Sequence, residues 1–170
     1  MSCVDIRGCR IGEGRPKVIL PIVERAEAAI LEKAAQFSTL QADCVEWRVD
    51  YFEGARAPGA VARCLAKMRV ILRDKLLLVT FRTKAESGEQ ALSHPEYLAF
   101  LRLILDTDCA DLLDIEFFTA GADLPNLVEQ AHSAGVAVVC SSHDFTKTPP
   151  RAELVCRMVQ MQQAGADLPK

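Results

Sequence analysis

Short runs of aliphatic and β-branched residues alternate along the chain with longer segments whose apolar residues recur every three or four positions. The short runs predict buried strands at residues 18–23, 44–49, 76–81, 112–117 and 136–141, and residues 166–170 start a sixth. The longer segments predict helices at residues 24–37, 60–73, 95–105, 124–134 and 151–164. This alternation predicts an α/β fold built from parallel βα units.

Polar residues at the predicted carboxyl ends of the strands decide between an open doubly wound sheet and a closed eight-stranded barrel. A barrel assembles its site from many strand ends, whereas an open sheet uses one switch point. In this chain, polar residues lie at or just past the carboxyl end of each predicted strand from the second onward. They are Glu46, Arg48 and Asp50; Arg82 and Glu86; Glu116; Ser142, His143 and Asp144; and Lys170. No glycine-rich nucleotide-binding motif follows any strand. We therefore predict a (β/α)8 TIM barrel.

The length of the chain limits how much of that barrel it can form. A closed barrel of this kind needs roughly 200 residues or more, and the 170 residues reach only the start of a sixth strand. We therefore expect about the first five and a half βα units, in one partial barrel domain over residues 1–170 without linkers. Such a unit leaves a strand edge unpaired and apolar helix faces uncovered.

Composition and charge narrow the class of partner. The chain is 50% hydrophobic and 25% charged, with a net charge of −3, as in a globular domain rather than a disordered or fibrous protein. It has no basic stripe for nucleic acid, no apolar run of the roughly 18 residues that span a membrane, and no signal-peptide core. We expect a cytoplasmic protein that binds a small molecule.

The seven cysteines do not point to a disulfide scaffold or a metal centre. Their number is odd, and none has the C-x-x-C spacing of a zinc site. Several lie in apolar runs, as Cys44 and Cys140 do, where a free thiol acts as a small hydrophobic group in a reducing compartment.

Two charged segments suggest a site for a small polar ligand. Glu46, Arg48 and Asp50 alternate, which places all three on one face of a strand. Charges on a buried strand must be paired, so they form either a structural ion-pair network or a substrate clamp. Arg82 precedes a polar loop over residues 83–90, where a guanidinium suits a carboxylate or hydroxyl-rich ligand, although such a loop alone is usually solvated surface.

His143 and Lys170 are candidates for catalysis because each follows an apolar strand. A histidine can take up and release a proton near neutral pH. His94 and His132 lie at or in helices and are expected to be structural or exposed. Lys170 is either a solvated chain end or, if its strand is buried, an amine whose pKa is lowered enough to attack a carbonyl.

Together these residues resemble the type I 3-dehydroquinate dehydratases of the shikimate pathway, which serves aromatic amino acid biosynthesis. The resemblance covers essentially the whole chain, and the order and separations of the motifs agree. It rests on Glu46-Trp47-Arg48-Val49-Asp50, Phe81-Arg82 with Glu86 and Gly88-Glu89-Gln90, Asp114-Ile115-Glu116, Ser142-His143-Asp144-Phe145 with Lys147-Thr148-Pro149, and Ala166-Asp167-Leu168-Pro169-Lys170.

The resemblance implies a barrel whose residues 1–15 form a hairpin across its bottom, and a lyase that dehydrates 3-dehydroquinate to 3-dehydroshikimate without metal or cofactor. It implies that Lys170 forms a Schiff base with the substrate ketone, that His143 is the general acid and base, and that Glu86 supports His143. Glu46, Arg48 and Arg82 would hold the substrate's hydroxyls and carboxylate. Family members are often dimers, so a homodimer is one expected assembly.

The sequence departs from the family at two points. Pro21 stands where the family commonly has a serine that touches substrate, and a proline also removes a backbone donor from that strand. The chain also stops after Lys170, about two and a half βα units before the family does, so it is expected to be truncated. Two alternatives follow: a catalytically impaired remnant, or another Schiff-base lyase of the class I aldolase kind.

Overall fold

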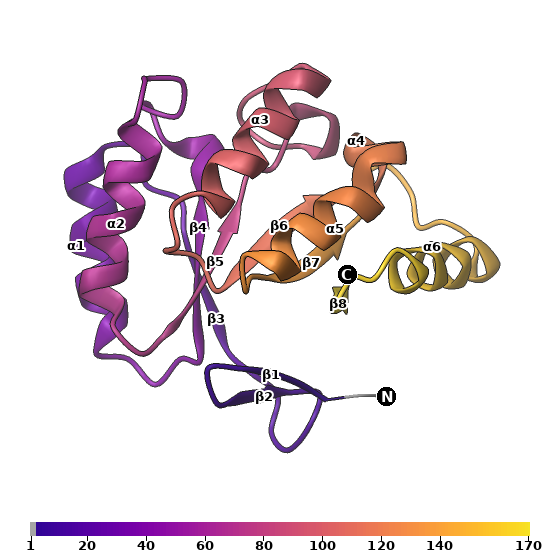
Figure 1. The fold of residues 1–170 in the computed structure, drawn as a ribbon, viewed down its shortest axis with the longest axis horizontal. Coiled ribbons are helices and arrows are strands. Elements are labelled where there is room, and N and C mark those ends of the chain that lie inside the picture. Colours follow the sequence, from indigo (N-terminus) through magenta and orange to yellow (C-terminus); the bar gives the residue numbers. More distant parts are fainter. Residues whose placement is uncertain (1–2) are drawn as a thin grey trace.

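The computed structural model describes residues 3–170, and its main element is a six-stranded sheet. All its neighbouring strands are parallel and follow one another in chain order (Figure 1). They are β3 (Ile19–Ile22), β4 (Cys44–Arg48), β5 (Leu76–Thr80), β6 (Leu112–Glu116), β7 (Ala137–Ser141) and β8 (Leu168–Pro169). Because the strand order does not reverse, the sheet lacks the switch point of a doubly wound fold. The order is that of consecutive barrel units.

Helices connect these strands as the sequence predicts. The helices are α1 (Glu27–Ser38), α2 (Ala60–Leu72), α3 (His94–Leu105), α4 (Phe117–Ala120), α5 (Leu124–Ser133) and α6 (Arg151–Gln163), with 3-10 turns η1 (Val49–Tyr51), η2 (Lys84–Glu86) and η3 (Gly121–Asp123). The five predicted helices are confirmed to within three residues, and α4 was not predicted. Among the helices of residues 3–170, none has the length and apolarity needed to cross a membrane.

Side-chain alternation along the strands gives the sheet two different apolar faces. One face packs with residues of all six helices and includes Val45, Leu77, Leu113 and Val138. The buried members of the other cluster are Ile6, Cys44, Leu76, Leu78, Leu112 and Val139, none of them from a helix. Helices thus cover one face only, as they do around a barrel, whereas a doubly wound sheet is covered on both.

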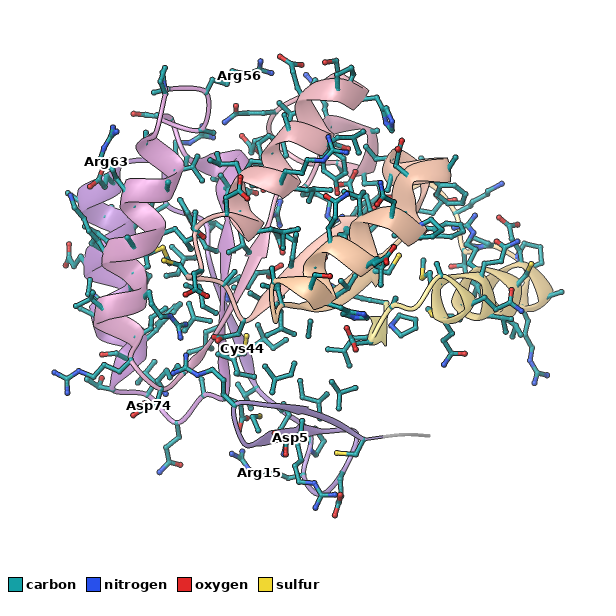
Figure 2. The ribbon with its side chains drawn as sticks, in the orientation of Figure 1. Asp5, Arg15, Cys44, Arg56, Arg63 and Asp74 are labelled. Carbon is teal, nitrogen blue, oxygen red and sulfur yellow. The ribbon has the colours of Figure 1, made fainter. Side chains whose placement is uncertain are left out.

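The second face is covered at its base by an antiparallel hairpin. It consists of β1 (Val4–Ile6) and β2 (Cys9–Ile11), joined through Arg7 and Gly8, both with positive φ. Such a two-residue turn matches the twist of a hairpin, and glycine adopts positive φ without strain. Ile6 packs in one cluster with Cys44 and Leu76. Figure 2 shows Cys44 above the hairpin, at the amino end of β4. A mostly apolar cavity of about 390 Å³ remains there.

Three aspartates, Asp43, Asp111 and Asp167, tie the amino ends of neighbouring strands together. Each carboxylate accepts the backbone N–H of one residue near the start of the preceding strand, namely Val18, Leu77 and Val138, at 2.7–2.8 Å. The backbone N–H of each aspartate donates to the carbonyl of that same residue. Each carboxylate also contacts a basic side chain: Arg15, Arg7 with Arg69, and His132 respectively. This repeated contact fixes the strand register at the end of the sheet opposite the predicted site.

The strand that contains Pro21 keeps its place in the sheet. β3 pairs in parallel with β4, and Pro21 lies opposite Glu46. β3 is an edge strand of the described sheet, which is where a proline without an N–H is tolerated.

Apolar side chains are exposed at both edges of the sheet. At β3 they are Val18, Ile19 and Val23, and on α6 they are Leu154, Val155, Met158 and Val159. Met161 is the one fully buried side chain of α6. The described residues thus leave one face of α6 and one edge of β3 uncovered, as the strand count predicts.

Burial predicts which thiols react slowly. Burial is the main cause that raises the pKa of Cys44, Cys64 and Cys140 to about 12, so only about one such thiol in ten thousand is a thiolate at pH 8. Cys156 is exposed on α6. We expect timed alkylation with N-ethylmaleimide, read by peptide mass spectrometry, to label Cys156 first and these three last. Early labelling of the three in native protein, at the rate seen in urea, would contradict the fold.

The contacts of Asp111 predict a loss of stability on substitution. Asp111→Asn replaces one acceptor oxygen with an NH₂ group that faces the Leu77 N–H or an arginine. We expect the free energy of unfolding to fall by about 2 kcal/mol, as for a buried donor left unpaired, measured by urea denaturation. Asp106→Asn, on the exposed end of α3, is the matched control. Equal midpoints for the two variants would show that the carboxylate contacts do not hold the strands.

Candidate active site

The six residues predicted to carry the chemistry gather at the carboxyl-terminal edge of the sheet. Glu46 and Arg48 lie in β4, and Lys170 directly follows β8. Arg82 and Glu86 lie in the segment after β5, and His143 lies in the segment after β7. In a parallel sheet these ends share one side, where barrel enzymes carry their active sites.

Glu86 and His143 form the most direct contact between predicted catalytic residues. Glu86 Oε2 lies 2.9 Å from His143 Nδ1 and accepts the His143 backbone N–H at 3.1 Å. A ring nitrogen that contacts a carboxylate carries the proton, so Nε2 keeps the lone pair that a base needs. Glu86 Oε1 is buried without a hydrogen-bond partner. The contact therefore fixes the orientation of the His143 imidazole and leaves Glu86 Oε1 without a hydrogen-bond partner.

Arg82 is buried among acidic groups rather than open to solvent. Its side chain is 6% exposed, and Nη2 donates to Asp114 at 2.9 Å. Nη1 contacts Glu116 and Ser141 at 3.0 Å and Glu86 at 3.3 Å. Burial alone would lower the pKa of Arg82, but Asp114, Glu116 and Glu86 outweigh it and raise that pKa. The guanidinium predicted to hold substrate thus donates three hydrogen bonds to carboxylates of the protein itself.

Asp114 and Glu116 complete this buried cluster. Both side chains are fully buried on β6, two residues apart and therefore on one face of the strand. Burial raises the pKa of Asp114, and it is opposed first by Arg82, then by the Ser141 hydroxyl and the charge of Lys170. Glu116 accepts the backbone N–H and hydroxyl of Thr83 and the hydroxyl of Thr119. The cluster thus connects β6 to the segment after β5.

Asp50 does not lie where the alternating pattern predicts. β4 ends at Arg48, and Asp50 belongs to η1 with its side chain fully buried. The prediction of three charges on one strand face is therefore wrong for Asp50. Asp50 departs from the pattern because its carboxylate turns back toward β4. There it accepts hydrogen bonds from Arg48 Nε and Nη2, both at 2.8 Å. This hydrogen bond is the main cause of the raised pKa of Arg48.

Arg48 and Glu46 occupy the same part of the site. The Arg48 guanidinium lies over the Tyr51 ring at 5.1 Å and is 21% exposed. Glu46 Oε1 accepts the Thr80 hydroxyl at 2.7 Å. Both side chains are half-buried, so each has atoms left for a ligand.

Lys170 lies beside the segment that carries His143. Its backbone N–H donates to Cys140 at 2.8 Å, and its carbonyl accepts the Ser142 N–H at 3.0 Å. The predicted strand over residues 166–170 is shorter, because β8 covers only Leu168–Pro169. The Lys170 side chain is exposed in the described residues.

Two further histidines and Asp144 make contacts that hold local structure. His94 contacts Thr119 and Asp123, His132 contacts Asp167, and both are exposed, as predicted. Asp144 caps its own turn by accepting from Thr146 and Lys147. Within residues 3–170, no group of three or more His, Cys, Asp and Glu side chains is placed to hold a metal ion.

Sequence reasoning missed the contacts of Ser141 and Asp114 with Arg82. The alternation of Asp114 and Glu116 in a predicted strand was a usable signal, because it places two carboxylates on one face, where they require a buried cation.

The chain matches the family model described as type I 3-dehydroquinase over residues 18–170. It is 44% identical over 170 residues to the 3-dehydroquinate dehydratase of Bacillus subtilis strain 168, covering 100% of this chain and 67% of that protein. It is 43% identical over 167 residues to that of Bacillus licheniformis, covering 98% of this chain and 66% of that protein. The chain thus spans about two thirds of the length of these curated relatives.

Solved structures give the same result. The type I 3-dehydroquinate dehydratase of Clostridium difficile, solved with covalently modified comenic acid, superimposes with a TM-score of 0.95 at 38% identity, over 99% of this chain and 66% of that one. The 3-dehydroquinate dehydratase of Enterococcus faecalis gives 0.94 at 40% identity, over 98% and 69%. Because the family model covers every strand of the six-stranded sheet and all six predicted site residues, and the relatives and solved structures agree, the chain belongs to the type I 3-dehydroquinase family.

Proposed function

We propose that the protein containing this chain dehydrates 3-dehydroquinate to 3-dehydroshikimate, through a Schiff base on Lys170. The observation that carries the proposal is the Glu86–His143 pair. The segment that contains His143 also contacts the Lys170 backbone, because the Ser142 N–H donates to the Lys170 carbonyl. Its relatives named 3-dehydroquinate dehydratase support the choice of substrate.

Imine formation is the first step of the proposed reaction. The Lys170 Nζ attacks the ketone carbon of the substrate, and the resulting carbinolamine loses water to give a protonated imine. The cationic nitrogen draws electrons through the imine carbon, so the C–H of the neighbouring carbon, C2, becomes acidic enough for a neutral imidazole to remove its proton. This chemistry requires the amine to be neutral when it attacks.

Proton transfer through His143 then releases water. His143 Nε2 takes the proton from C2, the electron pair forms the new carbon–carbon double bond, and the hydroxyl leaves with the proton that Nε2 returns. Hydrolysis of the imine consumes one water and frees the product and Lys170. The net change is loss of one water from the substrate, and His143 ends neutral as it began.

Glu86 supports the acid and base in this scheme. A carboxylate on Nδ1 keeps the imidazole in the tautomer whose Nε2 is a base, and it stabilises the imidazolium that forms transiently. Arg82 contacts Glu86, so the carboxylate is fixed from a second side.

Arg48, Glu46 and Arg82 are the proposed substrate contacts. Arg48 and Glu46 are half-buried and border the same edge of the sheet, which suits them to hydroxyl and carboxylate groups.

We also propose a cytoplasmic location, because all seven cysteines are free thiols, as is usual in a reducing compartment. The proposed assembly is a homodimer, and the molar mass measured by light scattering tests it.

Lys170→Met should abolish covalent trapping. With 3-dehydroquinate and sodium borohydride, we expect the wild-type protein to gain the mass of one reduced substrate adduct, because hydride fixes the imine as an amine. Lys170→Met offers no amine at that position and should give no adduct and no turnover. Lys147→Met, an exposed lysine in the preceding loop, is the control. An adduct on the Lys170 variant would place the imine elsewhere and overturn the mechanism.

Glu86→Gln should slow turnover without preventing the adduct. The amide keeps the shape of the side chain but loses the charge that stabilises the His143 imidazolium. We expect kcat to fall by roughly 10²-fold, the lower range for general acid and base catalysis, while borohydride still traps Lys170. Steady-state rates and intact mass on the same sample measure both. A normal kcat would remove Glu86 from the catalytic scheme.

A further inference from the structure

Asp50 has more hydrogen-bond partners than a simple ion pair needs. Oδ1 accepts Arg48 Nε at 2.8 Å and the Arg82 backbone N–H at 3.3 Å. Oδ2 accepts Arg48 Nη2 at 2.8 Å and the Glu89 backbone N–H at 3.1 Å. One fully buried carboxylate therefore contacts a proposed substrate-binding side chain and both ends of the segment over residues 82–89.

That segment forms a closed loop around Glu86. The backbone N–H of Gly88 donates to the Thr83 carbonyl, and the backbone N–H of Lys84 donates to the Gln90 carbonyl, both at 2.9 Å. A Cβ on Gly88 would lie 1.9 Å from the Arg82 carbonyl oxygen, so this close approach requires glycine. The Gln90 amide also donates to the carbonyls of Asp50 and Phe52.

The closed loop determines where the Glu86 carboxylate lies. Glu86 ends the single turn η2 inside the loop, and its side chain is 7% exposed. Its Oε2 contacts both the ring and the backbone of His143. A shift of the loop relative to β4 would therefore move Glu86 away from His143.

We infer that Asp50 is a positioning residue that holds two parts of the site in register, the Arg48 guanidinium and the loop that sets Glu86 against His143. The inference rests on the proposed function for its kinetic consequences. Asp50 acts through other residues, because its oxygens are occupied by Arg48 and by the backbone N–H groups of Arg82 and Glu89.

Asp111 is a close structural match for Asp50 at the other end of the sheet. It is also a buried aspartate that accepts a backbone N–H, from Leu77, and contacts arginines, Arg7 and Arg69. Its partners lie at the amino ends of the strands, away from the site. Loss of a buried carboxylate as such should thus affect Asp50 and Asp111 variants alike, whereas loss of positioning should affect only Asp50.

The test compares Asp50→Asn with Asp111→Asn in protein expressed from the complete gene. In Asp50→Asn an NH₂ group replaces one acceptor oxygen and faces N–H donors, so Arg48 and the loop cannot both keep their contacts. We expect kcat to fall by roughly 10²-fold, the effect of misplacing a catalytic group by about 1 Å, and KM to rise because Arg48 is released. Borohydride should still trap an adduct on Lys170. Asp111→Asn should keep kcat/KM within about threefold of wild type.

A readout without substrate separates this inference from the proposed function. In ¹⁵N-histidine NMR spectra, we expect the His143 Nδ1–H resonance, held by Glu86, to shift or exchange with water faster in Asp50→Asn but not in Asp111→Asn. If wild-type protein does not turn over 3-dehydroquinate, the proposed function fails, and this resonance still decides the role of Asp50. An unchanged resonance and kcat in Asp50→Asn, or equal changes in both variants, would overturn the inference.

Gln90→Ala keeps the test decisive if Asp50→Asn does not fold. It removes the two hydrogen bonds from the loop to the Asp50 and Phe52 carbonyls but leaves the Arg48–Asp50 pair intact. We expect a smaller fall in kcat, the same change of the His143 resonance and an unchanged KM. A normal kcat and resonance in this variant would show that the attachment of the loop to η1 does not position Glu86.

Discussion

The burial of the Arg82 guanidinium is the interaction on which the site depends. Asp114, Glu116 and Glu86 are each less than 10% exposed, and carboxylates so removed from water are stable only when paired. Arg82 contacts all three, and these contacts connect the segment after β5 to β6. Ser141 adds a contact to β7. Strands β6 and β7 and the segment after β5 thus all contact the Arg82 guanidinium. These contacts hold Glu86 within hydrogen-bond distance of His143.

The two ends of the sheet differ in what their charged residues do: those at the amino ends hold the strands together, and those at the carboxyl ends form the candidate site. At the amino ends, Asp43, Asp111 and Asp167 repeat one contact pattern that serves register, and the hairpin covers the apolar residues next to them. At the carboxyl ends of the described strands, Arg48, Arg82 and Glu86 each have a different set of contacts. This division is typical of barrels, in which loops at one end vary while the other end holds the strands. It also explains why Asp50 and Asp111, so similar chemically, should differ in their effect on catalysis.

The sequence determined much of the fold because periodicity is local. Strand and helix positions follow from alternation and from three- to four-residue spacing, and the polar residues at strand ends predicted one common edge. Contacts between distant residues were not readable in the same way. Arg82 is 32 residues from Asp114, so its burial depends on how β5 and β6 pair. The end of β4 at Arg48 was missed because Asp50 turns back on it, a contact that the alternating pattern does not encode. The exposure of Lys170 likewise depends on what packs around β8.

The uncovered edges bear on how rigid the site is. β8 pairs with β7 over two residue pairs only, whereas β6 and β7 pair over five. Lys170 follows the short pairing, and α6 before it buries a single side chain completely. Apolar area removed from water stabilises a fold by about 25 cal/mol per Å², so any segment that covers the exposed residues of α6 also holds β8 more firmly. Arg82 and Asp50 fix the positions of Glu86, His143 and Arg48 from within the described sheet. The position of the Lys170 amine relative to them depends most on packing at this edge.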